Sequence, residues 1–85
     1  MTPETRKQQL ERISVDPQVC FGKPVIRGTR IWVSLILDWL ADGESVADIL
    51  KEYPHLTEAD VRAAIAYGAE ASRSFAVDVP TKAAS

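Results

Sequence analysis

The strongest pattern of hydrophobic and polar positions lies in the middle of the chain. Large apolar residues recur there three and four positions apart, which is the spacing of one face of an α-helix. Gly43 follows at the position expected for a helix C-cap residue. The sequence therefore predicts a first core helix over about Val33–Asp42. Its apolar stripe is formed by Val33, Ile36, Leu37 and Leu40.

Two further helices are predicted by their start signals, a hydroxyl residue followed three positions later by a carboxylate. These pairs are Ser45 with Asp48 and Thr57 with Asp60. Pro54 should end the second helix, because proline cannot continue one. The third helix should be the longest and extend to about Ser74. Its stripe is rich in small side chains that permit close packing, and consists of Val61, Ala64, Ile65, Gly68 and Ser72.

The segment before these helices, GKPVIRGTRIWV from Gly22 to Val33, favours β-structure instead. Its proline and glycines disfavour a helix, whereas its β-branched and aromatic residues are typical of short strands. We predict that Val25–Ile26 and Arg30–Val33 pair as a small hairpin around a tight turn at Arg27–Thr29.

The N-terminal residues contribute one more strand. Ile13 and Val15 alternate with polar neighbours, as in a half-buried strand that pairs with the other strands or with a second copy of the chain. Residues 1–11 are polar, and both a frayed helix and a disordered arm are compatible with them. The expected fold is mainly α, in one domain over residues 1–85. Residues 12–33 would form a β-rich arm, 33–74 a three-helix core resembling helix-turn-helix domains, and 75–85 a flexible tail.

The first core helix carries a second apolar face, formed by Trp32, Leu35 and Trp39. A helix that is apolar nearly all round is usually buried all round, which a small three-helix domain cannot easily achieve. Tryptophan is also favoured at the centre of protein interfaces. We therefore expect this face to bind another chain, most simply in a homodimer. The alternative is that the β arm folds back over it.

Composition excludes several classes of function. No apolar run is long enough to span a bilayer, and the polar N-terminus does not resemble a signal peptide, so we expect a cytoplasmic protein without membrane contacts. One cysteine and one histidine cannot form a disulfide or a familiar metal site. No catalytic motif is recognisable, so we expect neither an enzyme nor a cofactor.

Binding to DNA would have to use a local patch, because the formal net charge is −2. The third helix begins with carboxylates, which suits phosphates poorly, and offers Arg62 as a candidate contact. The arm is the more basic surface, with Lys23, Arg27 and Arg30 as candidate DNA contacts of a β-ribbon. These cations are equally compatible with ordinary salt bridges to carboxylates such as Asp16 or Asp38.

Several motifs in order resemble the small bacterial proteins of the "domain of unknown function 433" family. They span about Arg12 to Glu70 and include Gly22–Pro24, Gly28–Arg30, Gly43–Ser45 and the Tyr53-Pro54 pair before Leu56-Thr57. Trp32 departs from the pattern, since many relatives have proline there. The resemblance implies a trihelical, homeodomain-like or winged helix-turn-helix fold with an N-terminal β segment, often dimeric.

The same resemblance implies a function. Members are commonly viewed as antitoxins that bind and neutralise a PIN-like nuclease toxin and frequently repress their own operon. The tail is the expected toxin-binding segment, with Arg73, Phe75 and Lys82 as candidate contacts. Two alternatives remain open: a stand-alone helix-turn-helix transcriptional regulator, and a structural dimeric interaction module.

Overall fold

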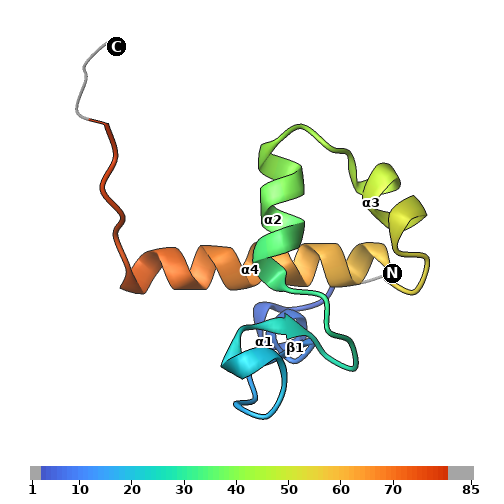
Figure 1. Cartoon of the computed structure of the whole chain (residues 1–85), viewed down its shortest axis with the longest axis horizontal. Coiled ribbons are helices and arrows are strands. Elements are labelled where there is room, and N and C mark those ends of the chain that lie inside the picture. Colours follow the sequence, from blue (N-terminus) through green and yellow to red (C-terminus); the bar gives the residue numbers. More distant parts are fainter. Residues whose placement is uncertain (1–2, 81–85) are drawn as a thin grey trace.

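The computed structural model describes residues 3–80 and shows a mainly helical domain with a short two-stranded sheet near its N-terminus (Figure 1). The mainly α fold with an N-terminal β segment is therefore confirmed. In chain order the elements are α1 (Arg6–Leu10), β1 (Ile13–Ser14), the 3₁₀ turn η1 (Cys20–Gly22), β2 (Val25–Ile26), α2 (Val33–Ala41), α3 (Val46–Glu52) and α4 (Glu58–Ser74).

Two of the core helices, α3 and α4, begin where the capping pairs predict. The Ser45 side chain accepts a hydrogen bond from the Asp48 N–H, which caps α3. Thr57 and Asp60 form a reciprocal capping box at the start of α4. Each pair satisfies backbone N–H groups that lack partners within the helix, so these boundaries follow from local chemistry.

The hairpin prediction was only partly right. The turn at residues 27–29 is present, with Gly28 at φ +81° and the Thr29 N–H donating to the Ile26 carbonyl. Across this turn Val25 forms an antiparallel bridge with Trp32, and two backbone hydrogen bonds join residues 24–26 to residues 31–33, although residues 30–33 are too short a ladder to form a strand. The other edge of β2 pairs with β1, in antiparallel register with Ile13 opposite Ile26.

A strained turn connects the two strands. Cys20, Phe21 and Gly22 all have positive φ, at 51°, 59° and 81°. Only glycine adopts this conformation without strain, so the first two residues are held there at a cost. The Phe21 side chain is 96% exposed and therefore contributes almost nothing to packing within the chain.

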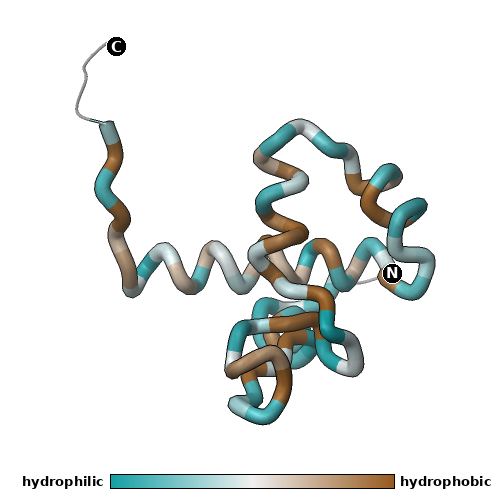
Figure 2. Tube along the Cα trace, in the orientation of Figure 1, coloured by the Kyte–Doolittle hydropathy of each residue, from teal (hydrophilic) through white to brown (hydrophobic). Residues whose placement is uncertain are grey.

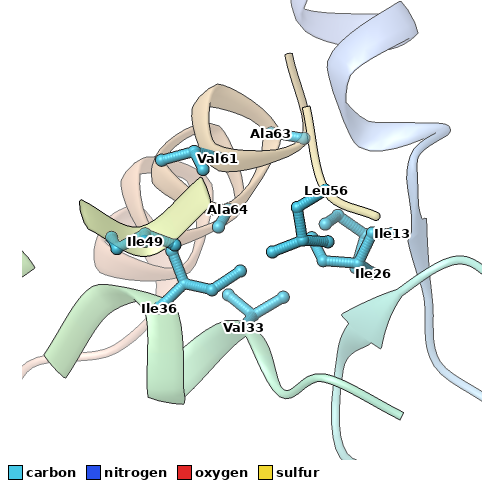
Figure 3. Packing of buried hydrophobic residues seen from close by; sticks show 9 residues of the cluster. All are labelled: Ile13, Ile26, Val33, Ile36, Ile49, Leu56, Val61, Ala63 and Ala64. Carbon is cyan, nitrogen blue, oxygen red and sulfur yellow. The ribbon is translucent and has the colours of Figure 1, made fainter. Parts of the chain in front are cut away.

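The core lies where α2, α3 and the sheet meet α4 (Figure 3). Ile36 of α2, Ile49 of α3 and Val61 of α4 are almost completely buried. Small residues of α4 allow this close approach: a Cβ atom added at Gly68 would lie 3.1 Å from Leu37 Cδ1. The predicted small-residue stripe is thus only partly right: Val61 and Ala64 are buried and Gly68 packs on α2, whereas Ile65 is 47% exposed and Ser72 is exposed too.

The N-terminal residues form a helix rather than a disordered arm. Thr5 and Gln8 make a capping box at the start of α1. The helix packs along α4, where Arg6 forms an ion pair with Glu70 at 2.7 Å. A five-residue helix is not stable by itself, so its order depends on this contact with α4.

The C-terminal half of α4 extends beyond the core, and the tail leaves it in an extended conformation (Figure 1). Residues 75–80 contain neither helix nor strand. Figure 2 shows that most of this segment is hydrophobic, with a hydrophilic position within it. Among the described residues, no helix is both long enough and apolar enough to cross a bilayer.

Candidate interaction surfaces

The basic arm places one of its three predicted cations over an aromatic ring. Lys23 Nζ lies 5.1 Å from the ring centroid of Trp32, a cation–π arrangement. Arg30 is also exposed, and its carbonyl oxygen lies 3.9 Å from the Cys20 thiol. Within residues 3–80 neither cation forms an ion pair. Both therefore present positive charge to solvent.

Arg27 has a different, structural set of contacts. Its guanidinium donates to the Glu11 carbonyl at 2.7 Å and to the Ile13 carbonyl at 2.9 Å. These bonds tie the β2 turn to the end of α1 and to β1. The alternative prediction, salt bridges from the arm cations to Asp16 or Asp38, was wrong for the described residues. None of the three cations forms an ion pair there, and Arg27 instead binds main-chain carbonyls.

Arg12, which no sequence pattern singled out, connects three parts of the fold. Its guanidinium binds the Glu4 carboxylate at 2.9 Å and Asp60 Oδ1 at 3.1 Å. The hydrogen bond from Arg12 lowers the pKa of Glu4 below its ordinary value of 4.5, and the same bond raises the pKa of Arg12. The sequence assigned Asp60 only to the cap of α4. Its second contact, with Arg12, joins residues 48 positions apart and left no local signal.

The exposed start of α4 is electrically balanced. Arg62, a candidate DNA contact, lies 3.6 Å from Glu58 in an exposed ion pair one turn earlier. Asp60 is held by Arg12, and α1 packs along the same helix. The surface of α4 therefore offers few cations for phosphate groups.

The face formed by Trp32, Leu35 and Trp39 is partly covered within the chain. Trp39 stacks on Tyr53 at the end of α3, with ring centroids 5.3 Å apart. Lys23 lies over Trp32, which still has 39% of its surface exposed, and Leu35 is half-buried. The fold thus covers Trp39 with α3 and leaves the other end of the face more open.

An acidic hollow of about 180 Å³ continues this face beyond Trp39. Its apolar lining is Trp39 and Ile49, and three carboxylates surround it, those of Glu44, Asp48 and Glu52. The sequence patterns assigned Asp48 to a capping pair with Ser45 and did not predict a shared hollow. Within the described part of the chain, no group of three or more potential ligands is arranged to hold a metal ion.

The tail exposes its large apolar residues. Phe75, Val77 and Val79 are 74%, 81% and 69% exposed. Arg73, just before them, lies 2.9 Å from Glu70 and also donates to the Ala69 carbonyl. Lys82, the last predicted toxin contact, lies outside the described residues.

Comparison with known proteins gives a family without an assigned activity. Residues 13–68 match the family described as "Protein of unknown function (DUF433)". A crystal structure of a DUF433 member protein from Anabaena variabilis is 33% identical in sequence and superposes with a TM-score of 0.69. The similarity covers 74% of this chain but only 62% of that one. None of the curated proteins matches. Because the family match covers more than half of the sequence and includes the arm and the core helices, the chain belongs to the DUF433 family.

Proposed function

We propose that this chain is a non-enzymatic, antitoxin-like protein that binds and neutralises a PIN-like nuclease toxin. The exposed apolar tail carries this proposal. Phe75, Val77 and Val79 follow α4 without covering any part of the core, and each is about three quarters exposed. Burying such side chains contributes about 1.5–3 kcal/mol each, so a partner that covers them gains substantial binding free energy.

The conformation of the tail supports binding to a protein rather than to another ligand. Phe75 has extended dihedral angles, φ −125° and ψ 146°, and the three large apolar residues occupy every second position. This spacing places the three side chains on one side of an extended strand, the form in which many peptides bind a protein groove or sheet edge. Arg73 is 64% exposed in its side chain and can exchange Glu70 for a carboxylate of the partner. An acidic nuclease cleft supplies such carboxylates.

The direct test is co-expression with the product of the adjacent reading frame, followed by size-exclusion chromatography with light scattering. We expect a stable complex and loss of the partner's ribonuclease activity. A variant with serine at Phe75, Val77 and Val79 should lose neutralisation. Its matched control replaces the alternate residues, Ala76→Ser with Asp78→Asn, and should neutralise normally. Equal neutralisation of the toxin by the two variants would refute the role of the tail. A wild-type chain that does not bind the product of the adjacent reading frame would refute the antitoxin function.

A stand-alone DNA-binding regulator is the second candidate, favoured by the cations of the arm. The order of α3, a short turn and α4 is compatible with a helix-turn-helix, but α4 carries balanced charge at its start. We therefore assign any DNA contact to Lys23 and Arg30 rather than to Arg62. A mobility shift on the upstream DNA that weakens steeply with salt would support this candidate, because phosphate contacts release counterions. A structural interaction module would show neither shift nor toxin binding.

A further inference from the structure

Charge is separated between the two ends of α2. One end leads from the arm, where residues 13–32 contain three cations and a single carboxylate. The other end leads into the turn before α3, where residues 38–55 contain five carboxylates and one lysine. Figure 1 shows the arm and the α2–α3 turn at opposite ends of α2. The chain therefore has a basic end and an acidic end joined by one helix.

Each end combines charge with an apolar surface. At the basic end, Lys23 lies over the partly exposed Trp32. Ile31 packs against the core, so the alternation of an extended backbone directs Arg30 to the same side as Trp32. At the acidic end, the hollow beside Trp39 is bordered by three carboxylates that form no ion pair within residues 3–80.

Leu35 lies about midway between these two ends on the same face. Trp32 and Trp39 are seven residues apart, which corresponds to about 10 Å along a helix. A two-fold axis near Leu35 would therefore bring two α2 helices side by side in opposite directions. The basic end of each copy would then meet the acidic end of the other.

We propose that the occupant of this face is a second copy of the chain, bound antiparallel along α2 in a two-fold symmetric dimer. Lys23 and Arg30 of each protomer contact the hollow bordered by Glu44, Asp48 and Glu52 in its partner, and the two Leu35 side chains meet near the axis. A two-fold dimer makes each contact twice, so both charged ends of each protomer are buried in the interface. No charged end remains free to bind a third copy and start a filament. An apolar centre with charges around it is the usual arrangement of a specific interface.

Charge complementarity distinguishes this arrangement from other pairings of two copies. An arm-to-arm dimer would oppose the three cations of one copy to those of the other, and a pairing of two α2–α3 turns would oppose carboxylates. Like charges facing each other disfavour association. Only the antiparallel arrangement pairs opposite charges at both ends and also covers the remaining exposed surface of Trp32.

The proposal is tested with two oppositely charged variants of the full chain. The acidic-arm variant carries Lys23→Glu and Arg30→Glu. The basic-end variant carries Glu44→Lys and Glu52→Lys; lysine at the last residue of α3 also suits the helix dipole, so folding should be preserved. Sedimentation velocity at micromolar concentration should show a dimer for the wild type. Each variant alone should dissociate with a Kd raised at least tenfold, because every repulsive contact occurs twice.

Mixing the two variants provides the decisive measurement. The acidic arm of one should bind the basic end of the other while their unmodified ends also pair, so an equimolar mixture should form a 1:1 heterodimer. The matched control for the acidic-arm variant, Lys7→Glu with Arg62→Glu, makes the same change in net charge as that variant but on α1 and α4. It should dimerise like the wild type. Circular dichroism checks that every variant is folded.

Three results would overturn the proposal: a monomeric wild type, an acidic-arm variant that dimerises as well as the control, or a mixture that forms no heterodimer. None of these results bears on toxin binding, which uses the tail. The dimer and the proposed function can therefore fail independently.

Discussion

Arg12→Ala is the substitution that best tests how the N-terminal residues are held on the core. Arg12 binds Glu4 on one side and Asp60, at the start of α4, on the other. The side chain of Asp60 is 14% exposed, whereas that of Arg12 is 36% exposed. The ion pair between them is thus neither fully solvated nor fully buried.

The expected magnitude follows from this partial burial. A hydrogen bond to a charged group contributes about 1.5–3 kcal/mol, whereas an exposed ion pair contributes about 0–1 kcal/mol. With one partner mostly covered and the other open to solvent, we expect the Arg12–Asp60 pair to contribute about 1 kcal/mol. For a domain of this size, such a loss lowers the melting temperature by about 4–8 °C.

A double-mutant cycle with Arg12→Ala and Asp60→Asn measures the pair directly. Asparagine keeps a side-chain oxygen that can accept the Thr57 N–H, so the cap of α4 survives. Urea denaturation at neutral pH gives the four free energies of unfolding. The control is Arg6→Ala, since the Arg6–Glu70 pair is about 40% exposed on both sides and should contribute less than about 0.5 kcal/mol. A coupling energy between Arg12 and Asp60 no larger than the loss of unfolding free energy in Arg6→Ala would refute the structural role of Arg12.

Three other predictions concern acid stability, the core and the strained turn. Because Arg12 lowers the pKa of Glu4, the ionised Glu4 carboxylate stabilises the fold above its ordinary pKa of 4.5, and this stabilisation is lost as the pH falls further. Urea midpoints measured from pH 6 to pH 3 should therefore decline less in Arg12→Ala than in the wild type. Parallel declines in the two proteins would contradict this. Ile36→Ala should cost about 3 kcal/mol in the same assay, since the side chain is fully buried, and a loss below about 1 kcal/mol would argue against the packing described. Phe21→Asn should stabilise the chain by about 0.5 kcal/mol, because asparagine tolerates positive φ and the exposed phenyl ring packs on nothing; a lower melting temperature would show that the ring makes contacts in solution.

Local patterns were sufficient to predict the three core helices. The periodicity of α2 and the capping pairs of α3 and α4 involve residues within one or two turns of each other, and each element starts at its predicted residue. The turn at Gly28 was equally local, because its conformation depends on a single residue that tolerates positive φ. Family membership was also recognisable from the order of short motifs.

Only the tertiary structure decided which distant segments meet. One edge of β2 binds residues 31–33 across the local turn, as predicted, but its other edge pairs with β1, which the sequence of β2 does not specify. Likewise, α1 is a helix because α4 supplies a surface for it, and Arg12 binds partners 8 and 48 residues away. These segments are ordered by the free energy gained when residues far apart in the chain bury each other. The periodicity within a single segment does not show which distant segment will cover it. The same holds for the acidic hollow, which exists only because the end of α2 lies against α3.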